Sequence, residues 1–135
     1  MSSTSSVSSP VTNALEDAVA ALKAGGLHVY ESGLSSKEEP GSAPLKLDGN
    51  PRLRLLLSII PLILKPSERK SVGSYGAKHV LERLLSCGYI SNGECIVAAV
   101  ALGYKWRHVG GSSPNVVIYG SWTWEGDLPF RFDCV

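Results

Sequence analysis

Basic and aromatic side chains alternate in the segment YKWRHV (residues 104–109) of this chain. On a β-strand, Lys105 and Arg107 would share one face, and Trp106 and His108 would take the other. Such a surface suits nucleic acid, because cations bind phosphate and aromatic rings stack on unpaired bases. Half-buried packing on an ordinary hairpin uses the same residue types. The segment is therefore a candidate binding surface with a structural alternative.

A second aromatic segment, VVIYGSWTW (116–124), follows the turn-like sequence GGSSPN (110–115). The order of strand, turn and strand predicts a β-hairpin. Tyr119, Trp122 and Trp124 would then add large rings to the strand that pairs with residues 104–109. This hairpin is the first candidate site for a nucleic-acid or protein partner.

A third group of candidate residues lies on a predicted helix over residues 74–86. Its apolar stripe comprises Ala77, Val80, Leu81, Leu84 and Leu85. Tyr75, Lys78 and His79 are expected outside this stripe, and Lys78 has the spacing to pair with Glu82. An exposed face of this kind would serve a partner or would simply be solvated.

Residues that would support catalysis or metal binding are not arranged in a known pattern. The three cysteines, Cys87, Cys95 and Cys134, do not suggest a disulfide framework, and their spacing is unlike that of zinc ligand pairs. We therefore expect no enzyme, no metal and no cofactor. A hydrolase that uses Cys87 or Cys95 with His79 is a distant alternative.

The charge is unevenly distributed, although the net charge of the 135 residues is only +1. Between residues 46 and 107 there are ten Lys or Arg and four Asp or Glu; the rest of the chain has three and eight. A basic middle segment favours an anionic partner, and the solvated faces of ordinary helices give the same count.

The remaining elements follow from caps and periodicity. Asn13 and Glu16 have capping-box spacing and begin a predicted helix that Gly25 and Gly26 end. Residues 27–30 suggest a short strand, 31–44 a linker, and 65–74 a polar connection. Asn50 would cap a helix that starts at Pro51 and that Pro61 kinks or ends near residue 60. Ser91 or Asn92 would cap a helix over 92–102, which Gly103 ends.

These elements predict an α+β fold with a small three-helix core (about 51–62, 74–86 and 92–102) followed by the hairpin, which is a winged-helix-like order. Residues 45–135 would form this domain, and residues 1–44 would be a flexible tail, an N-terminal helical arm and a linker. In a winged helix the third helix would read DNA, yet NGECIVAAVAL offers few side chains that can bind bases or phosphates. We expect that helix to be part of the core.

Three stretches resemble short uncharacterised proteins encoded by phages and other viruses: SYGAKHVLE (74–82), YISNGECIVAAVALGY (89–104) and SPN (113–115). The resemblance covers about a third of the chain. It implies a viral or mobile-element accessory protein, and it implies no particular activity. The N-terminal arm and the linker lie outside it.

The sequence thus predicts a small, non-enzymatic binding module, with nucleic acid as the first candidate partner. The alternative is a protein-interaction or assembly module that engages a host or viral protein through apolar and Trp-rich surfaces. No signal peptide is recognisable, and the apolar run over residues 55–64 is shorter than the roughly 20 residues that span a bilayer. We expect an intracellular, cytoplasmic protein, in the host cell if viral, and not a secreted one.

Overall fold

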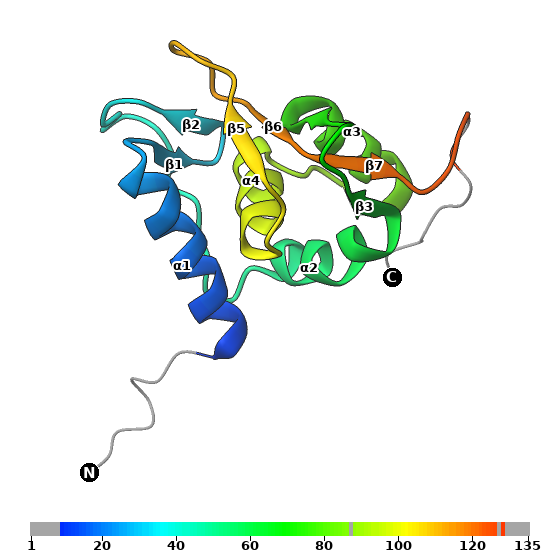
Figure 1. Ribbon diagram of the computed structural model, residues 1–135. Helices are drawn as coiled ribbons and strands as arrows, with labels where there is room; N and C mark the ends of the chain where they lie inside the picture. The colour runs from blue at the N-terminus through cyan, green and yellow to red at the C-terminus, as the bar shows by residue number, and fades with distance from the viewer. Residues whose placement is uncertain (1–8, 87, 127, 129–135) are drawn as a thin grey trace.

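The computed structural model describes residues 9–86, 88–126 and 128. Within them the chain is a mixed α+β protein with four helices and small antiparallel sheets, which confirms the predicted class. The helices are α1 (Pro10–Ala24), α2 (Pro51–Ile63), α3 (Ser74–Leu85) and α4 (Asn92–Ala101), and Figure 1 shows α1 and α2 on neighbouring sides of α4. The expected flexible tail lies almost entirely outside the described residues.

Helix α1 begins earlier than its sequence suggested. The Ser9 hydroxyl accepts a hydrogen bond from the backbone N–H of Thr12 at 3.1 Å, and Pro10 occupies the first helical position. Proline suits that position because its missing N–H would have no partner there. The capping role predicted for Asn13 was therefore wrong, while the end of the helix at Gly25 was predicted correctly.

Helix α2 begins at the predicted cap and continues past its internal proline. The side chain of Asn50 accepts from the N–H groups of Arg52 and Leu53. The prediction that the helix kinks or ends at Pro61 was wrong about the end, since α2 continues to Ile63. Pro61 lies in the last turn, where only one backbone hydrogen bond is lost and few residues remain to be displaced.

Helices α3 and α4 have the predicted positions. Ser91 accepts from the N–H of Glu94, and the Glu94 carboxylate accepts from the N–H of Ser91 at 2.9 Å, which completes a capping box. Gly103 follows the end of α4 with φ +88°, a conformation that favours glycine.

In the described part of the chain, seven short strands form three antiparallel sheets. They are β1 (His28–Tyr30), β2 (Gly33–Ser35), β3 (Leu64–Pro66), β4 (Val72–Gly73), β5 (Trp106–His108), β6 (Val116–Ile118) and β7 (Gly120–Trp122). Strand β1 pairs with β2, β3 with β7, and β6 lies between β4 and β5. The segment predicted as a linker (31–44) therefore contains β2, and the predicted polar connection (65–74) contains β4 and part of β3. The hydrogen-bonding partners of these short strands are distant in sequence or depend on a turn, so local patterns did not reveal them.

The second strand of the predicted hairpin is interrupted after Ile118. Residues 116–118 pair with β5, whereas residues 120–122 pair with β3, and Tyr119 lies between the two sheets. A Cβ on Gly120 would lie 2.8 Å from the Cγ atom of Leu64, so the residue must be small for β7 to lie against β3. The prediction of one continuous strand over 116–124 was wrong beyond Ile118.

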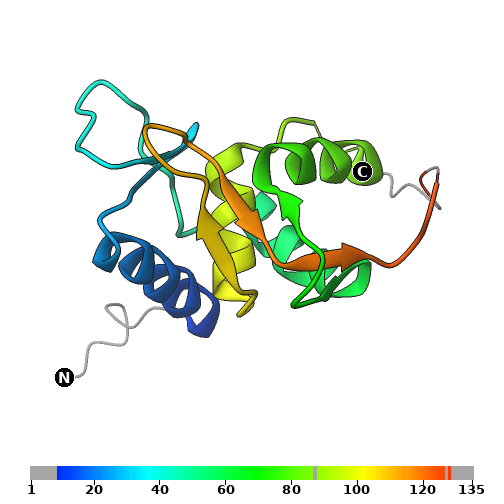
Figure 2. The same ribbon diagram turned by 45° about the horizontal axis from the view of Figure 1, so that its top comes forward.

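The N-terminal residues share the core of the remaining chain. Leu15, Leu22 and Leu34 are buried in the same cluster as the residues of α2, α3 and α4. Helix α1 lies along α4, and the turn between β1 and β2 reaches the start of α4, where the N–H of Gly93 donates to Glu31 O at 3.0 Å (Figure 2). The sequence left open whether residues 1–44 pack on the rest, and from residue 10 to 35 they do. None of the helices in the described ranges is long and apolar enough to cross a membrane.

Candidate functional site

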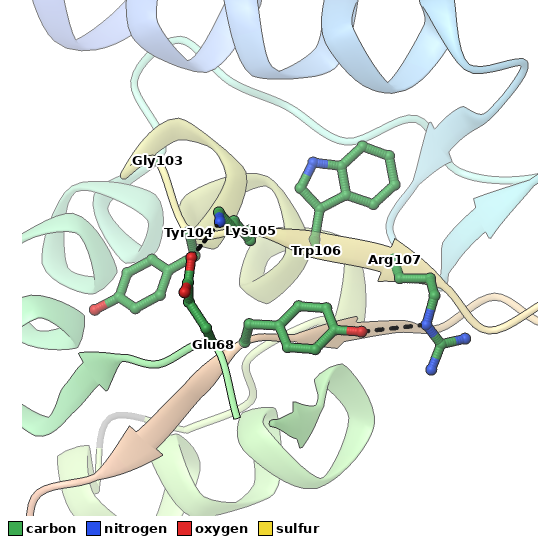
Figure 3. A pocket seen from close by; sticks show the side chains of 7 residues that line it. Glu68, Gly103, Tyr104, Lys105, Trp106 and Arg107 are labelled. Atoms are coloured by element: carbon green, nitrogen blue, oxygen red, sulfur yellow. Dashed lines mark hydrogen bonds and ion pairs between the residues drawn. The ribbon is translucent and has the colours of Figure 1, made fainter. Parts of the chain in front are cut away.

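A surface hollow of about 720 Å³ lies beside β5 and Tyr119, and we call it the hairpin hollow. Figure 3 shows its labelled residues along β5 and on the connection between β3 and β4. It is within the size range of small-ligand pockets. Its lining residues are Glu68, Gly103, Tyr104, Lys105, Trp106, Arg107 and Tyr119.

Three distant segments meet at this hollow through the backbone of Tyr119. The N–H of Tyr119 donates to Lys105 O at 2.9 Å, and the N–H of Ser67 donates to Tyr119 O at 3.2 Å. The β3–β4 connection, the start of β5 and the break between β6 and β7 are thereby held together. The side chains that they carry consequently share one surface.

An ion pair occupies one end of the hairpin hollow. The Nζ atom of Lys105 lies 2.6 Å from Oε1 of Glu68, and both side chains are largely exposed. Their hydrogen bond is the main reason that the pKa of Glu68 is lowered and that of Lys105 is raised. Both groups are charged at neutral pH, and because water surrounds them the pair stabilises the fold little.

Arg107 lies at the other end of the hollow. Its Nε donates to the hydroxyl of Tyr119 at 3.4 Å, and no ion pair to a described carboxylate engages its guanidinium. The planar guanidinium is well suited to bind phosphate with two hydrogen bonds. Figure 3 shows the Glu68–Lys105 pair and Arg107 at opposite ends of the group.

The alternation expected over residues 105–108 is present. Trp106 lines the hollow but is half-buried, and His108 does not line it. Lys105 and Arg107 are exposed, while Trp106 and His108 are half-buried. The indole of Trp106 packs against the hydrophobic core, and Nε2 of His108 lies 2.8 Å from Ser113 O. These two side chains support the hairpin and its turn, as the structural alternative predicts for them.

Three further cations come from β3 and the connection after it. Lys65, Arg69 and Lys70 are all exposed, and none of them forms an ion pair with a carboxylate among the described residues. We call these three together with Lys105 and Arg107 the basic surface. Glu68 is the one acidic residue within residues 64–73, so this part of the surface is positively charged.

Trp122 and Trp124 lie beside a separate hollow. Their ring centroids are 5.2 Å apart, and both rings are half-buried against the core. Together with Lys70 they line a hollow of about 540 Å³. The prediction that they share the hairpin surface with Lys105 and Arg107 was wrong in detail, because β7 leaves the hairpin to pair with β3.

The third group of candidates on α3 is only partly exposed. Tyr75 and His79 are exposed and meet edge to face with centroids 4.5 Å apart. Lys78, however, is only 4% exposed, so the prediction of an exposed lysine was wrong. Residues 88–90 fold over it, and its Nζ lies 4.4 Å from the ring centroid of Tyr89.

Glu82 explains how Lys78 is accommodated. Its carboxylate lies 3.4 Å from Lys78 Nζ, which is the predicted i, i+4 pair, and 3.0 Å from Nδ1 of His79. It also accepts from the N–H of Ile90 at 2.9 Å. The pKa of Glu82 is lowered, because these hydrogen bonds and the charge of Lys78 outweigh its partial desolvation. The contacts of Glu82 with Ile90 and of Lys78 with Tyr89 hold residues 88–90 against α3.

Within the described ranges, no group of three or more His, Cys, Asp or Glu side chains is placed to hold a metal ion. Cys87 and Cys134 lie outside those ranges. Cys95 is buried in α4, and burial raises the pKa of its thiol to about 12, although Lys78 acts in the opposite direction. A neutral, enclosed thiol is a poor nucleophile.

We expect Cys95 to resist alkylation in the folded protein. At pH 8 its thiol is neutral and inaccessible, so iodoacetamide should modify it at least about 100-fold more slowly than after unfolding in urea. Peptide mapping by mass spectrometry follows Cys95 separately from the other two cysteines. Equal modification with and without urea would contradict the burial of this residue.

Sequence reasoning did not predict Glu68, Gly103 or Tyr104 as site residues, and of these Glu68 carries the charge. It lies 37 positions before its partner Lys105 in a segment predicted only as a polar connection. The one available signal was its position among three cations in KPSERK, which indicates an exposed charged turn. The pairing itself depends on the contact of two distant segments.

Comparison with protein-family models, with curated proteins and with solved structures gives no match for this chain. Conclusions about function therefore depend on the geometry and chemistry of the described residues.

Proposed function

We propose that this protein is a non-enzymatic nucleic-acid-binding module that uses the hairpin hollow and the basic surface. The observation that carries the proposal is that Lys105, Arg107 and Tyr119 line one hollow. The backbone of Tyr119 also contacts Ser67, in the segment that carries the exposed cations Lys65, Arg69 and Lys70. Cations beside an accessible aromatic ring suit a single strand, whose phosphates and unpaired bases are available together. The proposed mechanism is charge pairing with phosphate and stacking on Tyr119.

The order of elements supports a winged-helix-like arrangement for residues 51–118. Helices α2, α3 and α4 precede the β5–β6 hairpin, and the sheet order β4–β6–β5 places the first strand beside the last. In that arrangement residues 109–115 would be the wing.

Helix α4 is a poor candidate for docking into a duplex groove. Residues 92–99 are all buried, and a Cβ on Gly93 would lie 2.0 Å from Tyr30 O. Helix α1 and the β1–β2 turn thus occupy the surface that a groove-reading helix would need. The proposed binding surface is accordingly the hairpin and the basic surface.

We also propose that the protein is a viral or mobile-element accessory protein that acts inside its host cell. Support comes from the resemblance of residues 74–82, 89–104 and 113–115 to such proteins. Several of these residues meet in space: Asn92 Nδ2 donates to Pro114 O and to Asn115 Oδ1 at 3.2 and 2.8 Å. Asn92 and residues 114–115 hold α4 against the wing, so we expect viral proteins that share this fold to share these residues as well.

The proposal predicts that a K105A/R107A variant loses affinity for nucleic acid. Each phosphate contact on a single strand contributes about 0.7 to the slope of log affinity against log salt, so two lost contacts should reduce the slope by about 1.4 and the affinity at 0.1 M salt by roughly 10- to 30-fold. Fluorescence anisotropy with labelled single-stranded RNA, duplex RNA and duplex DNA measures both quantities.

The matched control for this experiment is K23A/K37A, which removes the same charge from exposed residues that line neither hollow. It should keep the affinity within about threefold, because distant charges are screened. Circular dichroism checks that all variants remain folded. Unchanged affinity in K105A/R107A would remove the hairpin from the binding site.

The alternative function is a protein-interaction or assembly module. The observation that favours it is the exposure of three large side chains, Leu62 at 68%, Tyr75 at 55% and Tyr89 at 61%. Apolar interfaces respond little to salt, whereas phosphate binding weakens steeply as salt rises. Absence of nucleic-acid binding even at low salt would favour this alternative over the first proposal.

A further inference from the structure

The hairpin hollow is chemically asymmetric, which gives a bound base a preferred orientation. Glu68 provides hydrogen-bond acceptors at one end, and Arg107 provides donors at the other (Figure 3). Tyr119 contacts residues at both ends. Its N–H donates to the backbone oxygen of Lys105, the ion-pair partner of Glu68, and its hydroxyl accepts from Arg107. A base that stacks on Tyr119 would have one edge toward Glu68 and its phosphate toward Arg107.

We infer that the hollow binds one unpaired guanine, whose Watson–Crick edge donates to the Glu68 carboxylate while Tyr119 stacks on the base and Arg107 binds the adjacent phosphate. This inference rests on the proposed function, and it adds the chemical class of the base that the site prefers.

The preference for guanine follows from the acceptors that Glu68 offers. An ionised carboxylate accepts hydrogen bonds through two oxygens and donates none. Guanine presents two adjacent donors, N1–H and the exocyclic amino group, which match those two oxygens. Cytosine and adenine present one donor beside an acceptor, and uracil presents one donor between two carbonyl oxygens. Guanine is the one standard base that places no acceptor against the carboxylate.

Glu68 is able to change partners at little energetic cost. Its side chain is 80% exposed and that of Lys105 is 72% exposed, so their ion pair lies in water. Exposed pairs of this kind contribute little to stability. When Glu68 turns to the base, Lys105 is released to bind phosphate, so the free protein's ion pair is replaced by two new contacts. The lowered pKa of Glu68 keeps the carboxylate ionised, as this recognition requires.

The test compares guanine with inosine, which lacks only the exocyclic amino group. A labelled oligouridylate with one central guanosine and a matched one with inosine are titrated with the full-length protein at low salt. We expect about tenfold tighter binding of the guanosine oligonucleotide, as for a bidentate contact with a base. In E68Q, whose amide offers one acceptor and one donor, the difference should fall below about twofold.

A control variant and three distinct outcomes allow the guanine assignment to fail separately from the proposed function. E38Q removes the same charge from an exposed loop and should keep the preference. Equal affinity of the wild-type protein for both oligonucleotides would overturn the guanine assignment and leave the proposed function intact. A preference that survives in E68Q would overturn the role of Glu68. Absence of salt-sensitive binding to either oligonucleotide would overturn both proposals.

Discussion

Replacement of Glu94 by alanine is expected to lower the free energy of unfolding by about 2–4 kcal/mol, because it removes a buried carboxylate that accepts hydrogen bonds from three different groups. Glu94 is fully buried, and its carboxylate accepts from Asn50 Nδ2 at 2.9 Å, from Arg52 Nε at 3.0 Å and from the N–H of Ser91 at 2.9 Å. Without it, the buried N–H of Ser91 loses its acceptor, Asn50 Nδ2 keeps only Lys46 O, and the half-exposed Arg52 loses its ion pair.

The position of Glu94 explains why the effect should be large. Asn50 caps α2, and Ser91 caps α4, so one carboxylate joins the starts of two helices. Urea denaturation followed by circular dichroism measures the change in unfolding free energy. E16A is the matched control, since Glu16 is an exposed helical glutamate and its loss should change stability by no more than about 0.5 kcal/mol. A loss below about 1 kcal/mol in E94A would show that the network contributes little.

Signals that lie within one helix and its caps were readable from the sequence. The apolar stripe of α3 and the caps at Asn50 and Ser91 depend on residues at most four positions apart. Ser91 and Glu94 also have capping-box spacing, so the whole box is a local feature of the sequence. Asn13 misled the prediction because its spacing to Glu16 matches the same pattern, whereas Ser9 before Pro10 provides the actual cap.

Features that depend on distant segments were not readable. Lys78 is buried because residues 88–90 fold over it, and a helical pattern cannot show what covers an exposed-looking position. Glu68 reaches Lys105 only because the β3–β4 connection lies beside β5. In the hairpin, local alternation identified Lys105 and Arg107 as neighbours, but the transfer of β7 to β3 separated the two tryptophans from them. Gly120, inside the predicted strand, was the local sign of that break.

The division of the chain at residue 44 is a prediction that stability measurements can test. L22A should lower the free energy of unfolding by about 2–5 kcal/mol, the range for a leucine removed from a packed core. Leu22 lies on α1, is fully buried and belongs to the same cluster as α4. L62A is the matched control, because Leu62 is 68% exposed on α2 and the same substitution there should cost no more than about 0.5 kcal/mol.

The fragment of residues 45–135 extends this test to the whole N-terminal arm. It lacks Leu15, Leu22 and Leu34, each of which is buried in the shared core. Three such losses at about 2–5 kcal/mol each approach or exceed the total stability of a typical domain, about 5–15 kcal/mol. We therefore expect the fragment to show no cooperative urea transition, whereas the full chain shows one. A cooperative transition in the fragment would establish residues 45–135 as an independent domain, and α1 would then be an arm that covers α4 without being required for its folding.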